Sequence, residues 1–395
     1  MVKVEKYIRI SFTALAIFAC YMMTFVSFPG FEIYNKLKYV MMIFVFAYIA
    51  YHYRDLKCPW ISGAEKVVFL AYVVLSFIAS IRNLSEVVTR DPLIQCIGHC
   101  GILIANFLLM VILCNTKRLK VLGEIYVKLS IILLIVTDVT ILMGVTFGGN
   151  YLIGNKFGVA YHHIRTLLIF LIYVKEWDFR NKVTLVLMLI ATYLINTRTD
   201  CATGIIGTLF VLFLLLLFTR QINIVLHPIC QVPILYACTM FPIWYKPMMD
   251  MKVIRFIIED ILHRKMNLTG RTRIYSRIPE IFGDHILWGD GINTNVEICG
   301  RWGFSNIQNG MLKVMMESGL IAAIMVFILY FLIFHRAKHH DGRIERALSS
   351  YLLLMTVLST VEITISVSTL AVLMCLCVLT GYEKETETAE KKDTE

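Results

Sequence analysis

Long apolar runs recur along the whole chain, separated by short polar segments. A helix that crosses a bilayer needs about 20 mainly apolar residues, and most of these runs approach that length. The pattern predicts twelve membrane-spanning helices with the approximate bounds 8–28, 36–53, 66–81, 94–114, 126–147, 160–175, 182–196, 201–219, 223–244, 309–335, 347–361 and 363–381. The last two runs are almost continuous, but Glu362 and its polar neighbours favour a tight turn between them.

The composition points to an all-α polytopic membrane protein. Hydrophobic residues make up 58% of the 395 residues, charged residues only 17%, and the mean hydropathy is +0.71. A soluble domain carries about 25% charged residues, so this chain has too few to cover a surface in water. The composition argues against a soluble enzyme, a secreted module and a nucleic-acid binder, although the net charge is +10.

The basic residues predict the orientation, because Lys and Arg collect in cytoplasmic loops of membrane proteins. With the N-terminus in the cytoplasm, the cytoplasmic segments carry 21 basic residues and the short outer loops carry 7. Both termini are therefore expected in the cytoplasm. The first apolar run is expected to remain as a helix, because no signal-peptide cleavage site follows it.

One long polar segment, 245–308, interrupts the apolar pattern and is expected outside the membrane. Within it, Ile254, Ile257, Ile258 and Ile261 have helical spacing, which predicts an amphipathic helix. A second helix is expected after Gly270. The chain thus divides into an N-terminal bundle (1–244), a large extracytoplasmic loop (245–308), C-terminal helices (309–381) and a disordered cytoplasmic polar tail (382–395).

Arginines are concentrated in this loop. Arg271, Arg273 and Arg277 lie within about two turns of the second predicted helix. A helix N-terminus attracts anions, and guanidinium forks match phosphate oxygens, so the cluster suits a pyrophosphate. The alternative is a solvated face paired with Glu280 and Asp284.

Two further basic residues in short outer loops are candidates for substrate binding. Arg198 lies between two apolar runs, although it could instead reach the lipid headgroups or pair with Asp200. Lys156 follows Asn155 in a loop polar enough to line a site.

Several polar residues near the outer face are candidates for chemistry. The proposed proton acceptors, among which the sequence gives no ranking, are His285, Asp290, Glu317 and Glu362. Asn309 would bind sugar or cap a helix. Asp138 lies within a span, where Thr137, Thr140 or His99 would hold it as a structural group. No metal-binding motif is present, so no metal and no cofactor is expected.

The order of these features resembles the bacterial superfamily of O-antigen polymerases and O-antigen ligases, which includes capsule and exopolysaccharide polymerases. The matching pieces are Gly154-Asn155-Lys156-Phe157, Thr197-Arg198-Thr199, Thr269-Gly270-Arg271-Thr272, Trp288-Gly289-x-Gly291-x-Asn293, Asn309-x-x-Leu312 and Glu317-x-Gly319-Leu320. The topology corresponds over the whole chain. One departure is Gln308, since the family often has His before the Asn, and its absence favours a polymerase over a ligase.

The resemblance implies a metal-independent glycosyltransferase of the bacterial cytoplasmic membrane. Its substrate would be an undecaprenyl-diphosphate-linked oligosaccharide, polymerised at the outer face into a surface polysaccharide. Membrane lipid, a flippase and a chain-length regulator are the implied partners, and no nucleic acid is expected. The alternatives are a ligase, a flippase or exporter of lipid-linked sugar, and a scaffold of a capsule complex.

Overall fold

The computed structural model describes residues 2–29, 31–83, 91–174, 178–219, 223–249, 251–256, 259–260, 271–340 and 342–394. Among these residues the protein is all-α: 79% of the chain is helical and there are no strands. Two isolated β-bridges, between Phe147 and Asn150 and between Tyr151 and Gly154, close the turn before the sixth long helix.

Each of the twelve apolar runs coincides with a long helix. These helices are α1 (Val2–Phe25), α2 (Glu32–Tyr51), α3 (Gly63–Arg82), α4 (Pro92–Asn115), α5 (Leu119–Leu142), α6 (Lys156–Tyr173), α7 (Phe179–Arg198), α8 (Ala202–Thr219), α9 (Pro228–Met249), α14 (Gly310–Ala337), α15 (Arg343–Leu358) and α16 (Val367–Thr394). Within the described part of the chain, five of them (α2, α3, α4, α5 and α14) are long and apolar enough to cross a membrane. The protein is thus an all-α membrane protein, and the crossing of all twelve helices remains a prediction.

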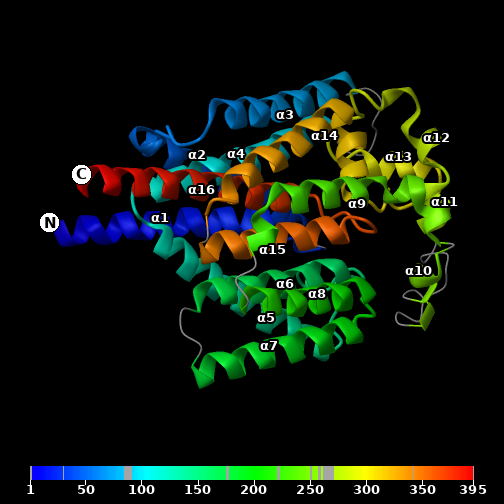
Figure 1. Ribbon diagram of the computed structural model, residues 1–395, viewed down its shortest axis with the longest axis horizontal. Coiled ribbons are helices and arrows are strands. Elements are labelled where there is room, and N and C mark those ends of the chain that lie inside the picture. The colour runs from blue at the N-terminus through cyan, green and yellow to red at the C-terminus, as the bar shows by residue number, and fades with distance from the viewer. Residues whose placement is uncertain are drawn as a thin grey trace.

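Short helices gather at one end of the bundle (Figure 1), which we name the loop end. They are α10 (Lys252–Phe256), α11 (Arg271–Tyr275), α12 (Ile278–Phe282), the 3-10 helix η5 (Gly283–His285) and α13 (Asn295–Arg301). Both chain termini lie at the opposite end, which we name the terminal end. The described residues also include the 3-10 helices η1 (Tyr53–Asp55) and η2 (Asn223–Leu226).

The predicted amphipathic helix falls largely outside the described residues, since Ile257, Ile258 and Ile261 are not among them, and α10 is its described part. The expectation for the tail differs from the structure. The polar tail continues α16 to Thr394 instead of being disordered.

A break in α14 lets the loop insert into the bundle. Gly319 has φ 90° and ψ 164°, so the helical hydrogen bonding is interrupted there and nearby backbone groups can bond to the loop. The N–H groups of Asp290 and Gly291 donate to the carbonyl oxygens of Met316 (2.7 Å) and Glu317 (2.9 Å). These bonds hold residues 286–291 against the loop-end half of α14.

We expect Gly319→Ala to destabilise the protein by about 2 kcal/mol or more, because its backbone angles are essentially restricted to glycine. An added Cβ would also lie 2.4 Å from the carbonyl oxygen of Leu287. Thermal unfolding in detergent measures the loss. Gly123→Ala is the control, since a Cβ there meets nothing within 4 Å. An unfolding temperature for Gly319→Ala at or above that of the control would contradict this account.

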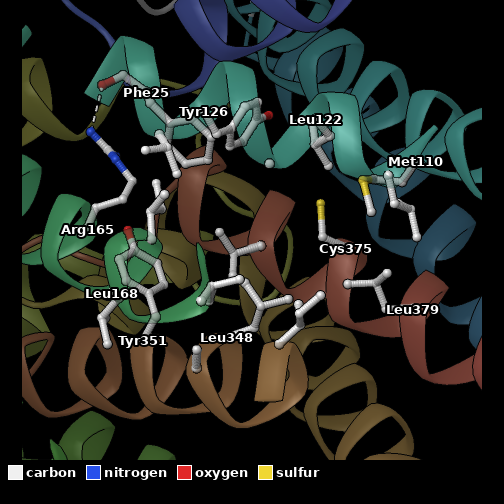
Figure 2. A pocket seen from close by; sticks show the side chains of 18 of the residues that line it. Phe25, Met110, Leu122, Tyr126, Arg165, Leu168, Leu348, Tyr351, Cys375 and Leu379 are labelled. Atoms are coloured by element: carbon white, nitrogen blue, oxygen red, sulfur yellow. Dashed lines mark hydrogen bonds between the residues drawn. The ribbon is translucent and has the colours of Figure 1, made fainter. Parts of the chain in front are cut away.

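A largely apolar cavity of about 170 Å³ lies among α1, α4, α5, α6, α15 and α16 (Figure 2). Arg165 and Tyr351 stand together at one end of it, and Leu379 stands toward the other. Its wall is mostly hydrocarbon, and the lining residues that carry polar groups are Asn106, Tyr126, Arg165, Tyr351 and Cys375.

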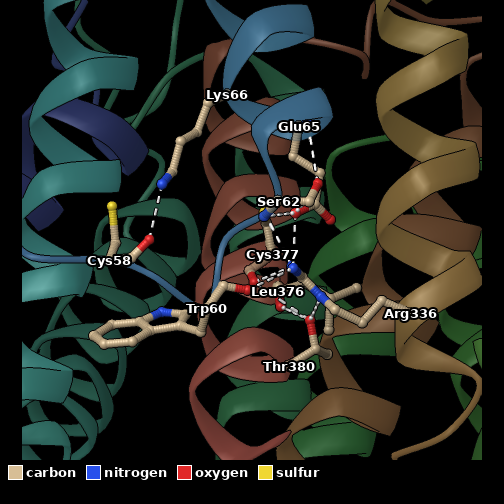
Figure 3. Close-up of polar contacts among 9 residues, drawn as sticks. All are labelled: Cys58, Trp60, Ser62, Glu65, Lys66, Arg336, Leu376, Cys377 and Thr380. Carbon is tan, nitrogen blue, oxygen red and sulfur yellow. Dashed lines mark hydrogen bonds and ion pairs between the residues drawn. The ribbon is translucent and has the colours of Figure 1, made fainter. Parts of the chain in front are cut away.

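A buried ion pair joins three helices near the terminal end (Figure 3). Arg336, in the last turn of α14, contacts the carboxylate of Glu65 at 2.7 Å and donates from Nε to Thr380 Oγ1 at 3.1 Å. Its Nη2 also donates to the carbonyl oxygen of Cys377. Glu65 in turn caps α3 together with Ser62. This cluster fixes α3, α14 and α16 relative to one another.

The predicted orientation has a direct test. Alkaline phosphatase is active only outside the cytoplasm, so we expect activity when it is fused after Trp302 and none when it is fused after residue 395. A reporter that fluoresces only in the cytoplasm should give the opposite pattern. Phosphatase activity at residue 395 would overturn the predicted orientation.

Candidate functional site

A buried Arg–Glu pair at the loop end is the centre of the candidate site. Arg271, the first residue of α11, pairs through Nη2 with Oε1 of Glu362, and its Nε donates to the carbonyl oxygen of Val361 at 2.9 Å. The Arg271 side chain is 17% exposed and that of Glu362 is 7% exposed. The pair therefore connects the large loop to the α15–α16 turn. The sequence named both residues but gave no reason to place them in contact.

The Glu362 carboxyl has a pKa near neutral pH. Burial raises its pKa to about 7, against the opposing effects of Arg271 and Lys156, which lower it. Near pH 7 such a group exchanges a proton readily. This residue is therefore the best-placed proton acceptor at the loop end.

Lys156 brings a second positive charge into electrostatic range of Glu362. It is the first residue of α6, which Asn155 caps by accepting bonds from the N–H groups of Phe157 (3.1 Å) and Gly158 (3.0 Å). The Lys156 Nζ donates to the carbonyl oxygen of Asp200 at 2.9 Å. The α7–α8 turn and the start of α6 thus lie together beside the pair.

Two tyrosines also lie beside the pair. Tyr161 is within electrostatic range of Glu362 and Arg271, and its buried hydroxyl has no hydrogen-bond partner within the described residues. Tyr275 donates from its hydroxyl to the carbonyl oxygens of Thr360 (3.2 Å) and Gln308 (3.4 Å). Tyr161 therefore offers an uncommitted hydroxyl, whereas Tyr275 braces the turn that carries Glu362.

Within the described residues, the other candidate arginines do not join this pair. Arg277 contacts Glu280 at 3.2 Å and lies over the ring of Trp302, and its side chain is 54% exposed. This is the partner expected under the solvated-face alternative. Arg273 is also exposed. Arg198 is exposed at the end of α7, two residues before Asp200.

Asn309 is fully buried and has the capping role considered for it. Its Oδ1 accepts from the N–H of Leu312 at 3.0 Å, which begins α14. Its Nδ2 donates to the carbonyl oxygens of Cys238 (3.0 Å) and Thr360 (3.4 Å). Sugar binding by Asn309 stays a prediction, and would require these contacts to be exchanged.

The remaining proton-acceptor candidates lie at the break in α14. His285 and Asp290 form a pair of 2.9 Å, in which the histidine side chain is 47% exposed. Glu317 is 3% exposed, with Oε2 3.5 Å from Lys313 Nζ. Its Oε1 has no hydrogen-bond partner in the described part of the chain.

The intramembrane carboxylate of Asp138 contacts His163, a partner that the sequence did not predict for it. His163 Nε2 lies 2.8 Å from Asp138, and His163 Nδ1 lies 3.1 Å from Thr192 Oγ1. The expected partners of Asp138 were therefore wrong, and His99 instead contacts Tyr72. Spacing along the sequence could not reveal this contact, because it joins α5 to α6.

No group of three or more His, Cys, Asp or Glu residues suited to a metal ion occurs among the described residues. The side chains of Arg271 and Lys156 place two positive charges at or near the Glu362 carboxyl. Glu362 is thus a proton acceptor with two cationic side chains nearby. This arrangement is suited to a reaction that releases an anion. No protein-family model, curated protein or solved structure matches this chain.

Proposed function

We propose that this protein is a membrane glycosyltransferase that polymerises undecaprenyl-diphosphate-linked oligosaccharides into a surface polysaccharide. The observation that carries the proposal is the buried Glu362–Arg271 pair with Lys156 in range. The resemblance of the loop motifs to O-antigen polymerases supports the choice of substrate. The distribution of basic residues supports a reaction at the outer face of the bacterial cytoplasmic membrane.

In the proposed reaction, a sugar hydroxyl of one lipid-linked unit attacks the anomeric carbon of another. The new glycosidic bond forms as the bond from that carbon to the pyrophosphate oxygen breaks. Glu362 accepts the hydroxyl proton. The electron pair leaves with the pyrophosphate, whose charge Arg271 and Lys156 stabilise.

The ion pair gives this reaction a means of balancing charge. Before the reaction, Arg271 neutralises the Glu362 carboxylate. Once Glu362 is protonated it carries no charge, so the Arg271 guanidinium can form an ion pair with the departing pyrophosphate. The Tyr161 hydroxyl, without a partner in the described structure, is available to donate to the same anion.

The test uses purified full-length protein in nanodiscs with a lipid-linked repeat unit and excess EDTA. We expect a ladder of products, because in the proposed reaction Arg271 and Lys156 supply the positive charge at the leaving pyrophosphate. A single addition to a different acceptor would indicate a ligase, and units that cross the bilayer without growth would indicate a flippase. Loss of activity in EDTA that Mg²⁺ restores would contradict the proposed role of Arg271.

A further inference from the structure

We propose that the cavity in Figure 2, together with the basic residues at its terminal-end rim, binds an acidic glycerophospholipid of the leaflet at that end. Part of one acyl chain would occupy the cavity, and the phosphate would lie among the basic side chains. This inference is independent of the proposed polymerase function, because the cavity shares no residue with the Glu362 site.

The shape and wall of the cavity suit a hydrocarbon chain. Its lining runs along α5 from Leu119 to Val127, about 12 Å at the rise of an α-helix, and along α15 from Ile344 to Tyr351. The cavity is therefore elongated parallel to the helices. Apolar spaces of this kind do not hold ordered water, and inside a bilayer the available filler is a lipid chain.

Basic residues predominate in the first two turns of α5 and α15 at the terminal end, where the acidic residues are the half-buried Glu124 and the buried Glu345. Leu119 and Ile344 lie at the starts of α5 and α15, where the cavity reaches the end of the bundle. Lys120 directly follows Leu119 and is exposed, and Arg343 directly precedes Ile344 and is half-buried. Arg118 directly precedes Leu119, and its Nη1 donates to Thr13 Oγ1, so Lys120 and Arg343 are the rim residues proposed to meet the phosphate. An anionic headgroup is the complement of this rim, and each such charge strengthens binding by about fivefold.

The opposite end of the cavity is less suited to a phosphate. Arg165 is 8% exposed there, and its guanidinium contacts the carbonyl oxygen of Phe25 (3.2 Å) and His162 Nδ1 (3.1 Å). It also lies over the Phe25 ring at 4.4 Å. Arg165 is nine residues into α6, about 14 Å from its start, so a phosphate there would be buried near the bilayer centre. At the terminal-end rim, by contrast, a phosphate would remain hydrated.

The first experiment measures lipid retained by the purified full-length protein. Phosphatidylglycerol and phosphatidylethanolamine with identical chains are added, and bound lipid is counted by native mass spectrometry. We expect phosphatidylglycerol to be preferred at least tenfold, because only its headgroup carries a net negative charge. Equal retention of the two lipids would overturn the proposal.

The second experiment blocks the cavity. Gly123 lines it, and a Cβ there meets nothing within 4 Å, so Gly123→Phe would fill the space without displacing the backbone. We expect at least a tenfold loss of retained lipid at an unchanged unfolding temperature in lipid-free detergent. Gly63→Phe is the matched control, since Gly63 is exposed and also has open space. Undiminished retention in Gly123→Phe would place the lipid elsewhere and refute the inference.

The third experiment separates the charge from the chain. Lys120→Gln with Arg343→Gln should erase the preference for phosphatidylglycerol while leaving phosphatidylethanolamine retention unchanged. Arg180→Gln with Lys182→Gln is the control, because both residues lie on α7, which contributes no lining residue. If a prenyl pyrophosphate displaces the phospholipid one for one, the cavity belongs to the substrate and the inference is wrong.

Discussion

Replacing Glu362 by Gln is expected to lower the rate of polymer growth by about 10²- to 10⁴-fold, the usual contribution of a general base. The amide keeps the size of the side chain but cannot accept the proton of the sugar hydroxyl. Chain growth on a lipid-linked repeat unit measures the rate. The matched control is Glu280→Gln, because Glu280 belongs to an exposed Arg–Glu pair with Arg277. That control should grow polymer at the wild-type rate.

The same residue sets the expected dependence on pH. A general base works only when it is deprotonated, and burial raises the pKa of Glu362 to about 7. The wild-type rate should therefore rise with pH and level off above about 7, and fall tenfold per unit well below it. The residual rate of Glu362→Gln should lack this acidic limb. If the acidic part of the pH–rate profile were unchanged in Glu362→Gln, the general base would instead be Glu317 or the His285–Asp290 pair.

The long helices could be predicted because hydropathy reports directly on burial in a bilayer. Each of the twelve apolar runs contains a helix, and the polar break at Glu362 falls between α15 and α16 as expected. The cap at Asn309 and the Arg277–Glu280 contact were also among the stated possibilities, since both depend on neighbours in sequence. Residue spacing in the sequence therefore predicts helices, helix caps and contacts between sequence neighbours.

Contacts between distant segments could not be predicted in the same way. Arg271 and Glu362 are 91 residues apart, and nothing in either segment specifies the other as a partner. The hydropathy pattern does not indicate the break in α14, because the break is stabilised by backbone hydrogen bonds to residues 286–291. Only Gly319 marks it, and a single glycine within an apolar run is also tolerated in an unbroken helix.

Arg271 is expected to be the arginine that matters most among the candidates, because it alone contacts the buried carboxylate in the described structure. Its Nε and Nη2 bind two different acceptors, Val361 and Glu362. A lysine keeps the charge but has one nitrogen in place of this fork. Arg271→Lys should therefore lower polymer growth by about 10²-fold or more, whereas Arg277→Lys should change it less than twofold.

Stability measurements separate the catalytic role of Arg271 from its structural one. Arg271→Ala leaves Glu362 buried without its partner, which typically costs about 3 kcal/mol. Adding Glu362→Gln removes the unpaired charge, so the double variant should regain much of that stability while remaining inactive. The unfolding temperature in detergent and the polymer length, measured on the same preparations, distinguish the two effects. Wild-type polymer from a stably folded Arg271→Ala protein would show that the guanidinium does not bind the leaving pyrophosphate.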